Sequence, residues 1–246
     1  MKLIINPKSF VSEFVNPVNE INREGRIAIF VDDDNIYSIS STKTDSIRLF
    51  NTYKPYGIEN AENKVCLNIL RLVKGLMCIN EDQTSIELDI DEKNKNCSFD
   101  SVDIKFNVKL LDERMVSIPK FNVKAFKEFP FEYNIEVNQD AMSNIKRGLE
   151  FSSETGKFYI EQENDVVFFF FGDKNSTSDH TDSIRVKIAD NISDTIPNKI
   201  YDIDILKLIL KHKNDFSIKL NTKGVMFIEI QNNNSTLKYI TTPLIK

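Results

Sequence analysis

Hydrophobic residues recur at helical spacing in four separate segments of this chain. The clearest pattern lies in residues 68–77, where apolar side chains fall at positions i, i+3, i+4 and i+7 and predict an amphipathic helix. The same spacing predicts helices over residues 138–149 and 204–213. A fourth helix is expected to begin at Asn6, which can cap it, and to be kinked or ended early by Pro17.

Alternating apolar and polar positions predict β-strands between these helices. Residues 26–31 and 35–40 flank three aspartates in a hairpin pattern, and residues 157–161 and 166–171 form a similar pair in the second half. Further strands are expected at residues 101–111, 181–188, 223–231 and 236–241. Each half of the chain thus consists of two rounds of strand, helix and antiparallel strands. This order predicts an α+β fold in which the helices pack on one face of the sheets.

Part of the sequence occurs twice. Residues 44–48, Thr-Asp-Ser-Ile-Arg, return unchanged as residues 181–185, and an Asn-Lys pair follows further along in each half, at residues 63–64 and 198–199. Because the matches keep their order, we predict two homologous domains, residues 1–113 and 131–246, joined by a connector at residues 114–130. Such quasi-symmetry usually serves a symmetric assembly or a symmetric ligand.

Composition narrows the class of protein. The chain has 246 residues, of which 41% are hydrophobic, and it includes 18 Phe, which is typical of a well-packed globular protein. Three cysteines without a CxxC pair and only two histidines support neither a disulfide framework nor a zinc site. No apolar run approaches the length of a signal peptide core or a membrane span. We therefore expect a cytoplasmic protein with no membrane partner, no metal and no cofactor.

Charge is unevenly distributed along the chain. The formal net charge is -5, yet basic residues lie off the apolar stripe of three predicted helices. They are Arg71, Lys74, Lys146, Arg147, Lys207 and Lys211. A basic surface of this kind attracts the phosphate backbone of nucleic acids without reading the sequence. On any single helix, the ordinary interpretation of an outward lysine is solubility, and it is the recurrence at related positions that favours binding.

An enzyme is the least favoured class. Residues 32–34 are three consecutive aspartates, but successive side chains on extended backbone point in opposite directions and converge poorly on one metal ion. A hairpin turn is the better interpretation of this string. No phosphate-binding, dinucleotide-binding, zinc-protease or serine-hydrolase motif occurs, and His180 and His212 have no evident nucleophile partner. We therefore predict no catalytic residues.

Two strings near the chain middle and end resemble a known family. Residues 237–239, Leu-Lys-Tyr, are followed by Pro243 and Ile245, and residues 116–119, Val-Ser-Ile-Pro, come directly after an expected strand. They resemble the C-terminal signature and the start of the interdomain connector in the two-domain DNA sliding clamps, the family of proliferating cell nuclear antigen and tailed-phage clamps. The resemblance covers essentially the whole chain. Richness in Asn, Lys and Ile is more typical of a phage or other viral clamp.

The resemblance implies a function and two sites. It implies a homotrimeric ring that encircles double-stranded DNA, tethers a DNA polymerase and is opened by a clamp loader, in the host cytoplasm if the protein is viral. The six cations named above would line the pore, and the 101–111 edge of one subunit would pair with the 181–188 edge of the next. A pocket for partner peptides would be framed by Val116, Ile118, Ile240, Thr242 and Pro243.

Other interpretations remain open at this point. Ile240 stands where cellular clamps carry an aromatic residue, and Val116 and Ile118 could instead simply close a domain core. The whole chain could also be a non-enzymatic scaffolding protein with duplicated β-rich domains, or a processivity factor that forms no ring. Native mass and the behaviour on DNA with and without free ends separate these classes.

Overall fold

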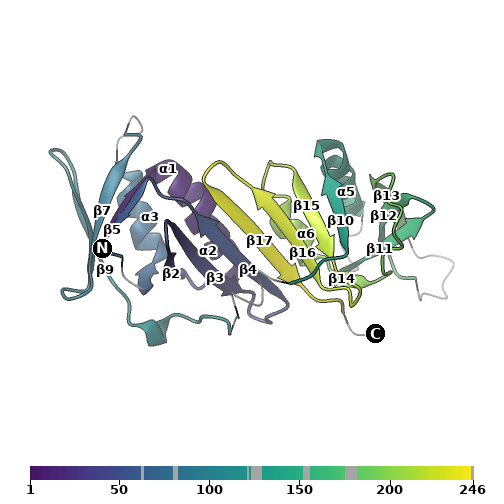
Figure 1. Cartoon of the computed structure of the whole chain (residues 1–246), viewed down its shortest axis with the longest axis horizontal. Coiled ribbons are helices and arrows are strands. Elements are labelled where there is room, and N and C mark those ends of the chain that lie inside the picture. Colours follow the sequence, from purple (N-terminus) through teal and green to yellow (C-terminus); the bar gives the residue numbers. More distant parts are fainter. Residues whose placement is uncertain are drawn as a thin grey trace. The chain divides into compact units, whose positions relative to one another are not determined.

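The structure is a computed structural model, and it describes residues 1–61, 64–79, 83–120, 122, 129–151, 156–174 and 182–244. The chain forms two compact units (Figure 1). Unit 1 comprises Met1–Phe121 and Asn232–Leu237, and unit 2 comprises Asn122–Gln231 and Lys238–Lys246. Both units contain helices and antiparallel sheets, so the predicted α+β class is confirmed.

Unit 1 contains two rounds of strand, helix and strands. The first round is β1 (Lys2–Ile5), the helical segments α1 (Pro7–Ser9), η1 (Phe10–Val15) and α2 (Asn16–Asn22), then β2 (Arg26–Asp32), β3 (Asn35–Ser41) and β4 (Ile47–Tyr53). The second round is β6 (Lys64–Asn68), α3 (Ile69–Met77), β7 (Ile86–Asp91), β8 (Asn96–Asp100) and β9 (Lys105–Lys109). The short strand β5 (Gly57–Glu59) lies between the rounds, and the 3-10 turn η2 (Glu113–Met115) follows β9.

Unit 2 repeats this plan. Its first round is β10 (Tyr133–Val137), α5 (Gln139–Phe151), β11 (Lys157–Glu163), β12 (Val166–Phe171) and β13 (Ile184–Ala189). The second is β14 (Ile200–Asp202), α6 (Asp204–Ile209), β15 (Phe216–Leu220), β16 (Met226–Gln231) and β17 (Ser235–Thr241). The first residues of β17 belong to unit 1, where the Thr52 hydroxyl on β4 donates to the carbonyl of Thr236 at 3.3 Å.

The strand order of the sheets is the same in both units. Unit 1 has the orders β5-β1-β7-β8-β9 and β4-β3-β2-β6, and unit 2 has β10-β15-β16-β17 and β13-β12-β11-β14. Strand by strand, β1 corresponds to β10, β4 to β13 and β9 to β17. Only β5 has no counterpart among the described residues of unit 2. The two units therefore share one topology, and the domain boundaries at residues 113 and 131 stay a prediction.

Helices pack on the sheets through the apolar stripes that the sequence shows. Ile69, Leu72 and Leu76 of α3 are buried, and in unit 2 α5 lies beside β12 and β13 (Figure 1). At Gly148 this helix comes so close that an added Cβ would lie 2.3 Å from the Phe171 ring. A side chain there would push α5 away from the sheet, so glycine sets the depth of the packing.

Pro17 was expected to kink the first helix or end it early, and the helix does not end there. A π-helical stretch, Phe10–Val15, leads into α2, which continues to Asn22. Pro17 has no amide hydrogen, so the Glu13 carbonyl loses its usual donor four residues on. The side-chain amide of Asn51, fully buried on β4, lies 3.4 Å from the Glu13 carbonyl and 2.8 Å from the Phe14 carbonyl. This donor and the wider π turn together allow the helix to pass the proline.

Two other elements are shorter than expected. Within residues 101–111 only Lys105–Lys109 is a strand, because residues 101–104 form a turn in which the Ser101 amide donates to the Ile104 carbonyl at 2.9 Å. Val102, expected on the apolar face, is fully exposed in this turn. The helix expected over residues 204–213 ends at Ile209.

Candidate nucleic-acid interface

Helix α3 carries the clearest cationic surface. The Asn68 side chain caps it by accepting a hydrogen bond from the Arg71 amide at 2.9 Å, and the buried stripe fixes which side faces the sheet. Arg71 and Lys74 are exposed on the other side, and neither forms an ion pair within the described part of the chain. Their charges are therefore available to a ligand. Leu70 and Met77 are exposed on the same helix, 60% and 75% respectively.

Helix α5 presents its two predicted cations beside acids. Asn138 accepts a hydrogen bond from the Ala141 amide at 3.0 Å and so caps the helix. Lys146 and Arg147 are exposed, but so are Glu150 and Asp140 of the same helix. The net field at this surface is consequently weaker than at α3.

The two cations predicted in the last helical region, Lys207 and Lys211, are both exposed. Lys207 is exposed, but its ammonium group lies 2.8 Å from an Asp204 carboxylate oxygen one turn earlier. Lys211 follows the end of α6, in a tightened turn where its amide donates to the Leu208 carbonyl at 3.4 Å. Exposed i,i+3 ion pairs are weak, so Lys207 can exchange Asp204 for a phosphate.

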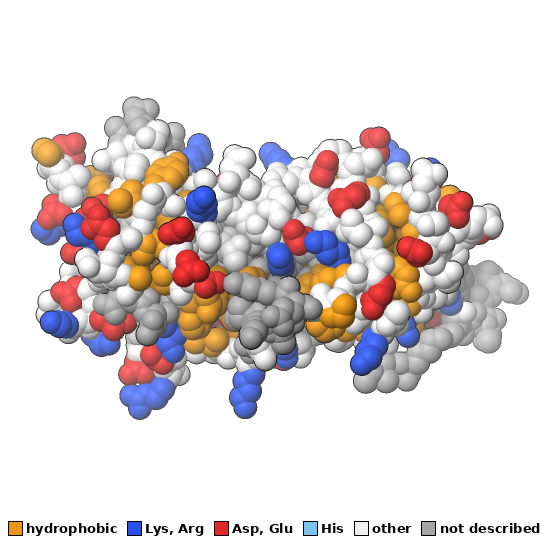
Figure 2. All heavy atoms as spheres, viewed as in Figure 1, with side chains coloured by type: hydrophobic (Ala, Val, Ile, Leu, Met, Phe, Trp, Pro, Cys, Tyr) orange, Lys and Arg blue, Asp and Glu red, His pale blue; other side chains and the backbone are white. Residues whose placement is uncertain are grey.

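The exposed side of the first helix was not among the sites predicted from the sequence. The exposed side chains recur every three or four residues and include a cation at each end: Lys8, Ser12, Asn16, Asn19 and Arg23. Their spacing is visible in the sequence, but a helix expected to be kinked or ended early by Pro17 did not predict one continuous exposed side. Basic and acidic side chains are interspersed on the face of the molecule drawn in Figure 2. Two exposed cations on one helix, as on α3, differ from this mixed distribution.

Each unit has one sheet edge at the position predicted for assembly. Strand β9 ends a sheet of unit 1, and β13 ends a sheet of unit 2. Both carry cations: Lys105 and Lys109 on β9, and Arg185 and Lys187 on β13. Charged side chains on an edge strand disfavour indiscriminate pairing, so any pairing of these edges has to be specific.

The β8–β9 ladder fixes which backbone groups of β9 face the open edge. At the end of this pair the Leu110 amide donates to the Lys95 carbonyl at 2.9 Å, and the register continues unbroken to Lys105. Hydrogen-bonded and non-hydrogen-bonded pairs alternate along antiparallel strands, so Phe106 bonds to β8 and Asn107 does not. The residues whose amide and carbonyl groups point to the open edge are therefore Lys105, Asn107 and Lys109.

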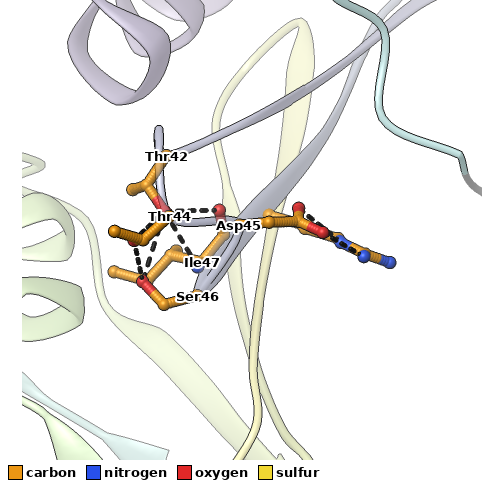
Figure 3. A network of polar contacts seen from close by, with 6 residues as sticks. Thr42, Thr44, Asp45, Ser46 and Ile47 are labelled. Atoms are coloured by element: carbon orange, nitrogen blue, oxygen red, sulfur yellow. Dashed lines mark hydrogen bonds and ion pairs between the residues drawn. The ribbon is translucent and has the colours of Figure 1, made fainter.

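The first copy of the repeated string forms the loop between β3 and β4 (Figure 3). The Thr42 hydroxyl accepts from the Ile47 amide at 3.2 Å, and the hydroxyls of Thr44 and Ser46 lie 2.9 Å apart. Asp45 has a left-handed backbone, with φ of 55°. The Arg48 guanidinium, which donates to its carboxylate at 2.9 Å, holds the pKa of Asp45 below its ordinary value.

The second copy leads into β13, the counterpart of β4, but makes different contacts. Arg185 donates to Glu163 at 2.6 Å and lies 3.3 Å from Glu161, both on β11. Its guanidinium stacks 3.8 Å above the Phe168 ring. The shared string therefore marks equivalent positions of a duplicated fold and not two copies of one binding site.

The expected connector begins with a capped turn and then joins a core. Asp112 accepts from the Arg114 amide at 3.0 Å, and the Arg114 side chain lowers the pKa of Asp112 to about 2. Val116 is only 8% exposed and packs with Ala28 and Cys66, while Ile118 is partly buried against the same cluster. Both side chains thus contribute to the core of unit 1, and their part in a partner pocket stays a prediction.

The C-terminal residues of the predicted partner site lie in unit 2. Ile240 and Pro243 are half-buried and Thr242 is exposed. The Leu244 amide donates to the Ile200 carbonyl of β14 at 2.8 Å, so this segment is held to the sheet edge. A partner can reach Thr242 and Pro243 here, whereas Val116 offers almost no accessible surface.

No protein-family model matches the chain, and no curated protein sequence matches it. Solved structures do match. A. fulgidus PCNA, in a structure with the C-terminal region of FEN-1 bound, has a TM-score of 0.76 at 12% identity, over 100% of this chain and 98% of that one. PCNA of Entamoeba histolytica has a TM-score of 0.73 at 12% identity, over 99% and 98%. The chain has the fold of the DNA sliding clamps.

Bacterial clamps share this fold but are longer. The DNA polymerase sliding clamp of Bacillus subtilis matches with a TM-score of 0.72 at 13% identity, over 100% of this chain and 64% of that chain. The predicted clamp fold is thus confirmed for two units, each with two rounds of strand, helix and strands.

In unit 1 the three aspartates form the predicted hairpin, with Asp32 paired to Asn35.

Within the described ranges, no group of three or more His, Cys, Asp or Glu side chains could hold a metal ion. Among the same residues, no helix is long and apolar enough to cross a membrane.

Proposed function

We propose that this chain is a DNA sliding clamp, a ring of three copies that encloses duplex DNA and tethers a replicative polymerase. The observation that carries the proposal is the match of the whole chain to clamp structures. Exposed cations on α3 and α5, in a protein of net charge -5, support it independently. The role is non-catalytic, since enclosure rather than chemistry keeps the polymerase on its template.

The proposed DNA surface is built for weak, mobile contacts. It consists of Arg71, Lys74, Lys146, Arg147, Lys207 and Lys211, to which the structure adds Lys8 and Arg23 on the first helix. Long flexible cations that contact phosphates carry no sequence information and can exchange one phosphate for the next. Tight or base-specific contacts would stop sliding, so a modest cationic surface suits this function better than a strongly basic one.

The proposed assembly uses the two open sheet edges described above. Strand β9 ends a sheet of unit 1 and β13 ends a sheet of unit 2, so the β9 edge of one copy can pair with the β13 edge of a second copy. The contact is head-to-tail, so it continues from copy to copy and closes if the rotation is right.

Threading on DNA tests enclosure directly. Protein is incubated with linear duplex, both ends are then blocked with streptavidin, and free protein is washed away at physiological salt. A ring should remain bound and should leave when a restriction enzyme cuts the duplex. A scaffolding protein or a non-ring processivity factor would show no difference between cut and uncut DNA, and that result would contradict the proposal.

The proposed partner surface on unit 2 can be tested separately. We expect Pro243→Glu to weaken binding of polymerase-tail peptides about tenfold or more, because a few buried apolar anchors carry most of the energy of such interfaces. Met115→Glu is the matched control, since Met115 is 46% exposed and lies in the expected connector, and it is not one of the residues of the proposed surface on unit 2. Fluorescence anisotropy measures both. Equal peptide affinity of Pro243→Glu and the parent chain would place the pocket elsewhere.

The remaining parts of the proposal follow from the clamp function. A closed ring needs a clamp loader to open it on DNA without ends, and a replicative polymerase to tether. The asparagine-, lysine- and isoleucine-rich composition supports a phage or other viral source, in which case the protein acts in the host cytoplasm.

A further inference from the structure

The two units differ at one sheet edge. In unit 1, β1 is covered by β5, with Lys2 opposite Glu59, Leu3 opposite Ile58 and Ile4 opposite Gly57. In unit 2, the corresponding strand β10 ends its sheet, and no strand of the described residues pairs with its outer side. The edge that unit 1 fills with its own chain is therefore open in unit 2.

The two strands correspond residue by residue. Both lead into an asparagine that caps the next helix, Asn6 after β1 and Asn138 after β10. Counting back from these caps, Ile4 corresponds to Glu136 and Lys2 to Asn134. In unit 1 the Ile4 carbonyl accepts a hydrogen bond from the Tyr56 amide at 2.8 Å. The Glu136 carbonyl is the equivalent acceptor in unit 2.

A groove of about 550 Å³ lies along this open edge. Its polar lining comes from three elements: Asn134 and Glu136 on β10, Asp140 and Asn144 on α5, and Lys187 and Asp190 at the end of β13. The Asn144 side chain donates to the Lys187 carbonyl at 3.2 Å, which ties the helix to the β13 side of the groove. The walls are thus fixed by packing and hydrogen bonds.

The charge of the groove selects its occupant. Glu136, Asp140 and Asp190 contribute three carboxylates, and Lys187, the lysine in the lining, lies 2.6 Å from Asp190. Glu136 and Asp140 are exposed and have no cation beside them within the groove. At the position of Glu136, unit 1 has the apolar Ile4, which packs against Gly57. At Glu136 an incoming strand therefore meets a carboxylate, where β5 meets the apolar Ile4.

We propose that the β10 edge binds an extended, lysine- or arginine-bearing segment of a partner protein as an added antiparallel strand. The segment takes the register of β5 on β1, so that three consecutive residues lie opposite Asn134, Ile135 and Glu136, and its cation lies opposite Glu136. Main-chain hydrogen bonds supply affinity and the acidic groove supplies selectivity. The inference goes beyond the proposed clamp function and needs neither a ring nor DNA.

The sequence of β5 supplies the probe. A synthetic peptide with the sequence of residues 54–60 and the change Gly57→Lys would place its lysine opposite Glu136, and the same peptide with Gly57→Glu is the matched control. We expect the lysine peptide to bind the full chain about five- to tenfold more tightly, because opposite charges across a strand pair attract and like charges repel. Binding should slow amide hydrogen exchange within β10.

A charge exchange provides the decisive comparison. In the protein variant Glu136→Lys, the preference should reverse, so that the glutamate peptide binds better than the lysine peptide. If the lysine peptide were instead attracted to acidic residues elsewhere on the chain, Glu136→Lys would not reverse the preference. The proposal is overturned if millimolar peptide leaves β10 exchange unchanged, or if the preference survives Glu136→Lys. It is also overturned if β10 is already protected in the assembled protein and loses protection on dissociation, because a second copy would then fill the groove.

Discussion

Replacing Asn107 with proline should abolish self-association and leave each chain folded. The backbone of Asn107 points to the open edge of β9, so its amide makes no bond to β8. Proline removes that donor and is tolerated on an edge strand. Losing one interchain hydrogen bond and leaving its buried acceptor unpaired costs about 2–4 kcal/mol together. That energy weakens each interface roughly 30- to 1,000-fold.

Two matched variants make this result interpretable. Asn107→Thr keeps the amide and should assemble like the parent chain, as measured by native mass spectrometry. Phe106→Pro, one residue away, removes a bond to β8 within the chain and should lower the unfolding midpoint as well as association. If Asn107→Pro retains the native mass of the parent, β9 is not the assembly edge and the proposed ring geometry is wrong.

The helices could be predicted because the buried side of a helix appears in the sequence as apolar residues at helical spacing. The stripe of Ile69, Leu72 and Leu76 marks the buried side of α3, and the asparagine caps mark where two helices begin. The fate of the first helix was not predictable. Its passage through Pro17 depends on Asn51, a donor on a strand distant in the sequence, and local propensity contains no information about such a partner.

Hydrophobic alternation also overestimated one strand. Val102 continues the apolar pattern of residues 101–111, yet it is fully exposed because the chain turns at Ser101. Alternation shows which face a residue would occupy in a strand, but it does not show where the strand starts. The burial of Val116 against Ala28 and Cys66 is likewise a contact between distant segments that no local pattern encodes.

The positions of the cations in the candidate DNA surface were predicted from the sequence, but whether an acid pairs with each of them was not. Arg71 and Lys74 are exposed without an ion pair among the described residues, as a binding surface requires, whereas Lys207 is paired with Asp204. The i,i+3 spacing of that pair is visible in the sequence. Lys8 and Arg23 were missed because the helix between them was expected to be kinked or ended early by Pro17.

Reversing both cations of α3, Arg71→Glu with Lys74→Glu, should give the largest loss of DNA binding among the helix surfaces. These side chains are exposed and form no ion pair with described residues, so their charge acts on DNA in full. Association with linear duplex should become less sensitive to salt, with the log–log slope falling by about 1.8 for each subunit that loses two phosphate contacts. The assembly and its unfolding midpoint should not change, because neither side chain takes part in packing.

The control variant changes the net charge by the same amount as the α3 variant, but at residues outside α3. Lys43→Glu with Lys93→Glu also replaces two exposed lysines, in loops between strands, and makes the chain just as much more acidic. General repulsion from DNA would weaken both double variants to the same extent. Contact through α3 predicts that only the helix variant loses the steep salt dependence and the threading onto end-blocked duplex. Equal losses, or no loss for the α3 variant at physiological salt, would remove α3 from the DNA surface and leave the clamp fold without its expected cationic lining.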